Sequence, residues 1–323
     1  MPDGARAVLV GGPEWHAARR EAKLLVVNDW LRFSFRRRSY QTVLQTWHGT
    51  MLKNLALGRP DVNLRTRIAI LRERRRWSLL LSQNPHSTKQ FASSYAFRGE
   101  IVETGYPRDD RLARSVVAGS EGVERIPLAV EAARRTLGVP AGARVLAYAP
   151  TWREAATRRG SAAGVVDEID VRLLAEALGD SWVVVARGHT RTHDHGGYAA
   201  TDKRVIDASR HPDVNDVILA ADLLVTDYSS LMFDAAVANV PMAFFVPDLA
   251  DYSRRERGFT FDFAGSAPGP LLDTRDGVVA CARAIEQHGS AADWMRSCAP
   301  AYAAWRARFV PHDDGHAARR GGG

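Results

Sequence analysis

The stretch Val214–Asp234, VNDVILAADLLVTDYSSLMFD, constrains the fold of this 323-residue chain more than any other. Leu223–Thr226 is an apolar run with no polar interruption, which predicts a buried strand of a parallel sheet. Asp227–Ser230 is a polar turn, and Leu231–Asn239 predicts a helix. This order places backbone N–H groups and hydroxyls where an anion binds, at the carboxyl edge of the sheet. The alternative is that the turn only caps the helix.

A second strand and polar turn lie near the N-terminus. Val43–Thr46 predicts a strand that leads directly into the turn Trp47–Thr50, and the following MLKNLAL predicts a helix. His48 can serve as a general base, because much of a histidine with an ordinary pKa is neutral at physiological pH. Gly49 would let a ligand approach the backbone, and Thr50 would cap the helix. The alternative is a structural histidine.

Short apolar strands alternate with helices along the chain, which predicts an α/β protein with parallel sheets covered on both faces. The turn-rich VPAGA at Val139–Ala143 divides it into two Rossmann-like domains that face a cleft, at 1–138 and 139–323, the second with closing C-terminal helices. The predicted strands are Ala5–Val10, Lys23–Asn28, Val43–Thr46, Leu79–Ser82, Ile101–Glu103, Arg144–Ala149, Trp182–Ala186, Val205–Asp207, Leu223–Thr226 and Pro241–Val246.

Composition narrows the class of protein. Two cysteines suggest neither a disulfide framework nor a metal cluster. No apolar run approaches the roughly 18 to 20 residues of a membrane span, so we expect a cytosolic protein. The formal charge of +7 favours anionic partners. The adjacent pairs Asp109–Asp110 and Asp313–Asp314 are expected at exposed, solvated turns, so no metal site is predicted.

Leu64–Trp77, LRTRIAILRERRRW, is the most basic segment of the chain. Leu64, Ile68 and Leu71 fall on one face of a predicted helix, and arginines occupy much of the rest. Such a helix can lie on an anionic membrane surface. The alternative is that its apolar face packs on its own domain while its charges are solvated.

Several stretches together resemble one family in order and spacing, from Leu24 to Arg320. They include LQTWHGTMLKNL, SQNPHSTKQFASSYAF, IVETGYPRDD, VLAYAPTWRE and DVNDVILAADLLVTDYSSLMFDAA. They resemble the CDP-glycerol glycerophosphotransferase family, which includes teichoic acid polymerases and primases. The resemblance implies a GT-B-type fold, a peripheral location at the inner face of the cell membrane, and a role in teichoic-acid-like or capsular cell-wall polymer synthesis. The implied partners are CDP-glycerol and a lipid-linked polyol-phosphate or glycan acceptor.

The resemblance also assigns roles. It implies that His48 is the catalytic base and that His189 contacts the donor phosphates, although Thr190 stands where the family commonly has proline. Ser229 and Ser230 match the donor-phosphate ligands. The remaining candidates are Asp227 to hold the turn, Arg187, Thr151 and Arg153 at donor-side strand ends, and Gly49 and Thr50 in the acceptor-side turn.

The implied reaction is chemically consistent with these residues. Attack of an acceptor hydroxyl on the β-phosphorus of a CDP-polyol needs proton removal, charge neutralisation and in-line positioning. No cofactor is expected, although a loosely held Mg²⁺ is left open. One alternative is a related GT-B transferase that uses CDP-ribitol or a nucleotide sugar. Another is a non-catalytic basic protein that binds nucleic acid or lipid, but no nucleic-acid-binding signature supports a nucleic-acid partner.

Overall fold

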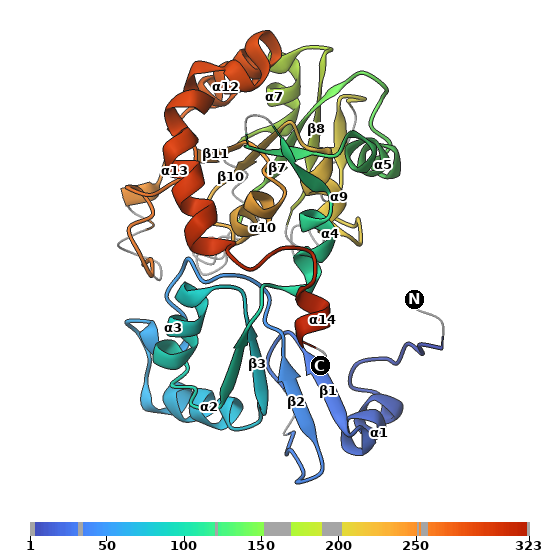
Figure 1. Ribbon diagram of the computed structural model, residues 1–323, viewed down its shortest axis with the longest axis vertical. Helices are drawn as coiled ribbons and strands as arrows, with labels where there is room; N and C mark the ends of the chain where they lie inside the picture. The colour runs from blue at the N-terminus through green and yellow to red at the C-terminus, as the bar shows by residue number, and fades with distance from the viewer. Residues whose placement is uncertain are drawn as a thin grey trace.

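Two parallel sheets, each with its own helices, organise the computed structural model (Figure 1). The structure describes residues 4–31, 35–119, 122–151, 169–188, 202–250, 252 and 258–321. One sheet has four strands in the order β1-β2-β3-β4, and the other has six in the order β12-β11-β10-β7-β8-β9. All neighbouring strands within the two sheets pair in parallel. The predicted α/β class is therefore confirmed.

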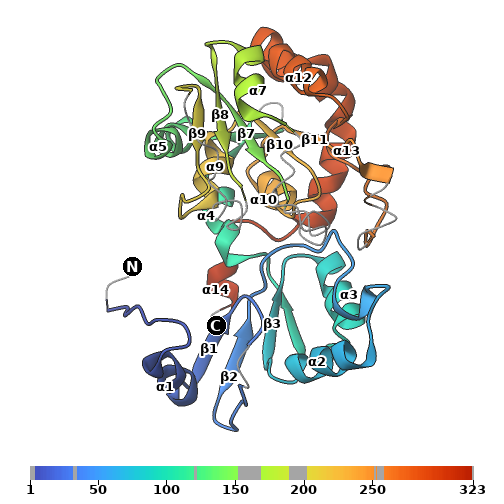
Figure 2. The same ribbon diagram turned by 180° about the vertical axis from the view of Figure 1, so that it is seen from behind.

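The N-terminal unit is built on the four-stranded sheet. Its strands follow one another across the sheet, so right-handed crossovers place α2 and α3 on the same face (Figures 1 and 2). Trp47, Trp77, Phe91 and Tyr95 pack edge to face or tilted beneath these helices. The elements are α1 (Pro13–Glu21), β1 (Leu24–Val27), β2 (Thr42–Gln45), η1 (Ala56–Gly58), α2 (Leu64–Arg74), β3 (Leu79–Ser82), α3 (Pro85–Ser94) and β4 (Glu100–Glu103).

The C-terminal unit has a core on both faces of its sheet. Along β7, Val145 and Ala147 belong to the cluster with α5 (Pro127–Leu137), α9, α10 and α13, whereas Leu146 and Tyr148 belong to the cluster with α7 and α12. The elements are β7 (Arg144–Ala149), α7 (Val171–Leu178), β8 (Trp182–Ala186), β9 (Val205–Asp207), α9 (Val214–Ala220), β10 (Leu223–Thr226), α10 (Leu231–Val237), β11 (Met242–Phe245), β12 (Leu271–Leu272), α12 (Arg275–His288), η3 (Gly289–Ala291) and α13 (Asp293–Phe309).

A connecting segment joins the two sheets. It contains η2 (Pro107–Asp109), α4 (Asp110–Ala113), the antiparallel hairpin β5 (Val116–Gly119) and β6 (Gly122–Arg125), and α5 (Pro127–Leu137). The Arg134 guanidinium of α5 donates to the carbonyl of Ala220 at 3.1 Å and to the carboxylate of Asp222 at 2.7 Å. Helix α5 therefore packs with the C-terminal unit. The domain division at residue 138 stays a prediction.

The end of the described chain returns to the N-terminal sheet, above which α14 (Ala317–Gly321) lies (Figure 2). Helix α14 also contacts η2 of the connecting segment. Asp110 accepts hydrogen bonds from the backbone N–H groups of Ala317 and Ala318, at 2.8 and 2.9 Å. Asp110 is 5% exposed, so its predicted place at a solvated turn is wrong. Its burial is explained by its partners more than 200 residues away.

Most predicted strands are confirmed, but two local predictions are wrong and one hairpin was missed. Residues 5–10 form no strand, and the hairpin β5–β6 was not predicted. MLKNLAL forms no α-helix, because its first half runs extended beside a distant segment instead. Lys53 forms an antiparallel bridge with Phe259, and the Thr260 N–H donates to the Leu52 carbonyl at 2.8 Å. This pairing joins the two units. None of the described helices has both the length and the apolarity that a membrane crossing requires.

Candidate functional site

The centre of the six-stranded sheet is a topological switch point. From the neighbouring pair β7 and β10, the chain builds β8 and β9 to one side and β11 and β12 to the other. Open parallel sheets bind ligands outside the carboxyl ends of the strands at such a point. Thr151 follows β7 and Asp227 follows β10, and both the N–H and the hydroxyl of Thr151 donate to the Asp227 carboxylate. Through these two hydrogen bonds Asp227, which is 3% exposed, holds this turn together.

Two serines lie between Asp227 and α10. The Ser229 hydroxyl accepts the N–H of Leu231 at 3.3 Å, as a partial cap, and Ser230 provides no side-chain cap. Both serines are half-buried. The predicted cap and the predicted hydroxyl donors are thus compatible: one serine supports the helix start and the other leaves its hydroxyl uncommitted to it.

The turn after β2 presents His48. The Nδ1 atom of His48 lies 2.8 Å from the carbonyl oxygen of Asn28, and its ring stacks on Trp47 with centroids 4.5 Å apart. Because a carbonyl only accepts, Nδ1 carries the proton, and Nε2 of the neutral ring keeps the free lone pair. The side chain is exposed. The ring is therefore oriented as an accessible proton acceptor.

Gly49 brings this turn against the serine turn of the other unit. Its φ is +151°, and a Cβ added there would lie 2.8 Å from Ser230 Oγ and 3.0 Å from Ser230 Cβ. Both the backbone conformation and the close approach require glycine. The structure thus places the residue after His48 in contact with Ser230, from sheets that are about 180 residues apart in sequence.

Three comparisons place the chain among known proteins. Residues 1–320 match the family described as CDP-Glycerol:Poly(glycerophosphate) glycerophosphotransferase. The chain belongs to this family. It is 33% identical over 323 residues to the "Teichoic acid glycerol-phosphate transferase" of Staphylococcus aureus, with 95% of this chain and 77% of the relative covered. It is 33% identical over 278 residues to the "Teichoic acid poly(glycerol phosphate) polymerase" of Bacillus subtilis, with 84% of this chain covered.

The chain spans only 36% of the length of the Bacillus subtilis polymerase. Among solved structures, the wall teichoic acid polymerase TagF superposes with a TM-score of 0.84 at 29% identity, covering 100% of this chain and 76% of that one. A TagF variant soaked with CDPG gives the same TM-score. The chain therefore has the GT-B-type fold of this family.

Other predicted site residues have structural partners or lie outside the described residues. Thr50 is 1% exposed, donates to Gln83 Oε1 and accepts from Asn84 Nδ2 at 2.9 Å, so it does not cap a helix. Arg187 donates to the carbonyls of Ala208 and His211, both at 2.8 Å, and holds the loop after β9. Burial lowers the pKa of its guanidinium. His189 and Arg153 lie outside the described residues.

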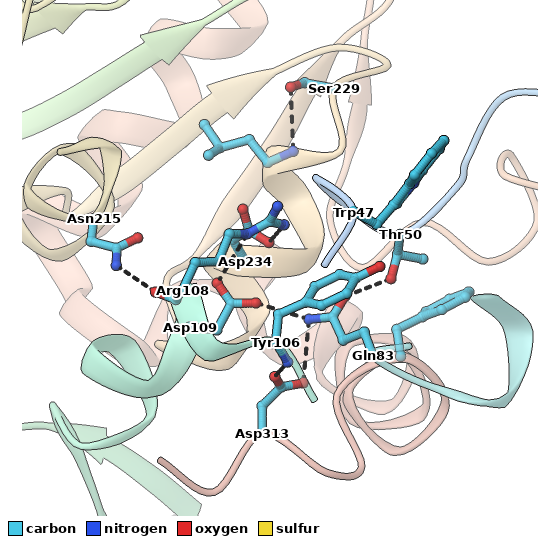
Figure 3. Close-up of polar contacts among 12 residues, drawn as sticks. Trp47, Thr50, Gln83, Tyr106, Arg108, Asp109, Asn215, Ser229, Asp234 and Asp313 are labelled. Atoms are coloured by element: carbon cyan, nitrogen blue, oxygen red, sulfur yellow. Dashed lines mark hydrogen bonds and ion pairs between the residues drawn. The ribbon is translucent and has the colours of Figure 1, made fainter. Parts of the chain in front are cut away.

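A buried acidic cluster, Asp109, Asp234 and Asp313, lies where the two units meet (Figure 3). Asp109 is 0% exposed, and Gln83 Nε2 donates to both Asp109 and Asp313, at 3.1 and 3.2 Å. The prediction that Asp109 and Asp313 are solvated is wrong. Within the described residues, no group of three or more His, Cys, Asp or Glu side chains is placed to hold a metal ion.

Arg108 and Asp234 are site-adjacent residues that the sequence analysis missed. Arg108 Nη2 donates to Asp234 Oδ1 at 2.6 Å, which connects η2 to α10 just after the serine turn. Both residues lie inside stretches quoted for the family resemblance, GYPRDD and SSLMFD. A charged residue in an otherwise apolar helix was the available signal for Asp234.

Gly49→Ala should lower the unfolding free energy by about 3 kcal/mol or more. The alanine would have to adopt a backbone conformation that favours glycine, and its Cβ would collide with Ser230. Gly142→Ala is the matched control, since Gly142 also has a positive φ, +78°, but nothing within 4 Å of an added Cβ. We expect about 1 to 2 kcal/mol there. Denaturant unfolding measures both. Adding Ser230→Gly to Gly49→Ala should recover part of the loss, and no recovery would disprove the contact.

The acidic cluster should make stability fall with rising pH. Burial raises the pKa of Asp313 to about 7, aided by the Asp234 carboxylate and opposed by hydrogen bonds from Tyr106 and Gln83. The folded state then binds this proton more tightly than the unfolded state, so the unfolding free energy falls as pH rises from about 4 to about 7. Asp313→Asn should reduce that fall by on the order of 2 kcal/mol.

Chemical unfolding at a series of pH values tests this prediction. Asp314→Asn is the control, because hydrogen bonding to Arg320 lowers the pKa of the exposed Asp314 to about 2, outside the same pH window. Its profile between pH 4 and 7 should follow that of the wild type. An Asp313→Asn profile that also follows the wild type would show that Asp313 is not the titrating group.

Proposed function

We propose that this chain transfers glycerol phosphate from CDP-glycerol to a hydroxyl of a membrane-linked polyol-phosphate or glycan acceptor, in cell-wall polymer synthesis at the inner face of the membrane. The contact between Gly49 and Ser230 carries the proposal, because it brings His48 and the serine turn together in a member of this family. Relatives named as glycerol-phosphate transferase and polymerase, and the TagF variant soaked with CDPG, support the donor.

In the proposed reaction, the acceptor oxygen forms a bond to the β-phosphorus of the donor. The bond from that phosphorus to the bridging oxygen breaks, and CMP leaves with the oxygen. The acceptor hydroxyl proton passes to Nε2 of His48, which is the ring nitrogen not committed to Asn28. Asn28 thus fixes the tautomer that a base requires.

The donor phosphates are proposed to lie at the switch point. Ser229 and Ser230 would donate hydroxyl hydrogen bonds to phosphoryl oxygens, while Asp227 holds their turn. His189, Arg187 and Arg153 are proposed to supply positive charge or further donors at the neighbouring strand ends. Thr151 is a weaker candidate than the serines, because its hydroxyl is already bonded to Asp227. We propose that the chain needs no resident cofactor; turnover in excess EDTA tests that part.

Wild-type protein should release CMP from CDP-glycerol in the presence of a lipid-linked glycerol-phosphate acceptor. His48→Ala should lower kcat at least about a hundredfold, because general-base catalysis contributes typically 10² to 10⁴ in rate. CMP release is measured by chromatography. His16→Ala is the control, since His16 lies on α1 next to Trp15, outside the two turns, and we expect wild-type rates.

Measuring CMP release from several CDP-polyols decides which donor the protein uses. No CMP release from CDP-glycerol, CDP-ribitol or any other CDP-polyol would contradict the proposal. Release from CDP-ribitol alone would support the proposed reaction and show that the donor polyol is ribitol, not glycerol. A wild-type rate in His48→Ala would support the activity but contradict the role of His48 as the base.

Helix α2 is the proposed membrane contact. Leu64 is 72% exposed and Ile68 is 41% exposed, whereas Ile70 and Glu73 are the residues of α2 that are buried. Helix α2 thus packs on its own domain through Ile70 and Glu73, as the alternative expects, whereas Leu64 and Ile68 of the predicted apolar face stay exposed. Exposed apolar side chains interspersed with arginines are what binding to an anionic bilayer surface requires.

Neutralising Arg65, Arg67, Arg72 and Arg75 to glutamine should weaken binding to phosphatidylglycerol vesicles, since each arginine near the surface contributes about 1 kcal/mol. Arg76 is left intact because it bonds the Leu31 carbonyl and Glu73. Vesicle sedimentation measures binding. Replacing four exposed arginines of other elements, Arg172, Arg275, Arg296 and Arg319, is the charge-matched control. Equal losses in both variants would indicate general charge attraction and contradict a specific role of α2.

A further inference from the structure

We propose that Arg108 is a positioning residue that sets the distance between the His48 turn and the serine turn. Arg108 lies in η2, in the segment that joins the two sheets, and its side chain is 32% exposed. The inference deepens the proposed transfer reaction, and its kinetic part rests on that function. It stands on three sets of contacts that converge on this one residue.

The first set ties Arg108 to the serine turn. Its Nη2 donates to Asp234 Oδ1 at 2.6 Å (Figure 3). Asp234 lies in the short helix α10, whose N-cap is Ser230. Asp234 is 5% exposed. A buried carboxylate that loses its cation is costly, so this ion pair fixes where α10 begins relative to η2.

The second set ties Arg108 to the His48 turn. Its Nη2 lies 3.6 Å from the position that a Cβ of Gly49 would occupy, so the guanidinium packs against this glycine. One nitrogen thus approaches both turns at the place where Gly49 meets Ser230. A side chain of another length or shape at position 108 would change how closely the turns approach.

The third set holds Arg108 itself in place. The Asn215 side-chain amide donates to the Arg108 carbonyl at 2.9 Å, and the guanidinium lies 4.9 Å from the centre of the Tyr106 ring. The adjacent Asp109 accepts from Gln83, which in turn accepts from Thr50, the residue after Gly49 (Figure 3). Polar contacts thus run from Thr50 through Gln83, Asp109 and Arg108 to Asp234 of α10.

This arrangement predicts a particular kinetic signature. A residue that acts by positioning the two turns, and not by binding the donor, should on substitution change kcat more than KM. We expect Arg108→Lys to lower kcat at least tenfold while KM for CDP-glycerol stays within threefold, because an ammonium cannot keep both the Asp234 bond and the planar contact with Gly49. Asp234→Asn should show the same split. The double variant should lose no more than the more impaired single variant, because the two residues act as one unit.

Arg111→Lys is the matched control. Arg111 is in the next helix and pairs with Asp213 and Asp216 of the C-terminal unit, at 2.6 and 2.5 Å, but neither partner is in the two turns. Its kcat should stay within twofold of wild type. A similar fall in kcat for both arginine variants would mean that any ion pair in this segment matters, and would overturn a specific role for Arg108.

Hydrogen–deuterium exchange separates this inference from the proposed activity. Peptides covering 46–50 and 227–234 should exchange faster in Arg108→Lys than in wild type. Their exchange rates should be unchanged in Arg111→Lys. Both expectations hold whether or not CDP-glycerol is a substrate. If wild type releases no CMP but exchange rises as expected, the proposed function fails and the positioning role stands. Unchanged exchange in Arg108→Lys, or a higher KM with wild-type kcat, would overturn it.

Discussion

The approach of Gly49 to Ser230 is the contact on which the arrangement of the site depends. A Cβ at Gly49 would come within 2.8 Å of Ser230 Oγ and 3.0 Å of Ser230 Cβ, so a larger residue would require one of the two turns to shift. The neighbouring Trp47 also has a positive φ, +58°, and is anchored by an aromatic cluster. Such backbone conformations persist only where packing enforces them. The packing of the N-terminal core thus holds the turn that contains His48 and Gly49, and Gly49 is the residue of this turn that meets Ser230.

The polar joint, which is formed by Arg108, Asp109, Asp234 and Asp313 beside this contact, is stable only when all of its members are present. Two buried carboxylates, Asp109 and Asp234, and the half-buried Asp313 lie near one guanidinium, that of Arg108, and desolvation raises the pKa of each carboxyl group. Removing one member of such a network leaves another without a partner, at a cost larger than a single hydrogen bond. The members come from η2, α10 and the C-terminal tail. The joint therefore forms only when both units and the end of the chain are in place.

The sequence predicts what local patterns determine and fails where distant partners decide. Apolar runs such as Leu79–Ser82 and Leu223–Thr226 have their predicted bounds, because burial on both faces leaves a continuous apolar signal. His48 and the serine turn were found from strand ends and from family resemblance. The burial of Asp313 depends on Tyr106 and Gln83, each more than 200 residues away. Likewise Lys53 pairs with Phe259, against the local helix propensity of MLKNLAL.

The pairing of Lys53 with Phe259 helps to hold the two units together before the proposed reaction begins. The segment around Lys53 is bonded to the segment around Phe259, and His86 of α3 contacts both the Met51 carbonyl and Thr260 Oγ1, at 3.1 and 3.0 Å. Separating the two units on this side would break several hydrogen bonds, each contributing about 1 kcal/mol net. On the other side the Arg108–Asp234 pair would also have to open. With ties on both sides of the Gly49–Ser230 contact, His48 and the serines are held near each other before any substrate binds. Substrate binding energy is then available for the transition state rather than for assembling the site.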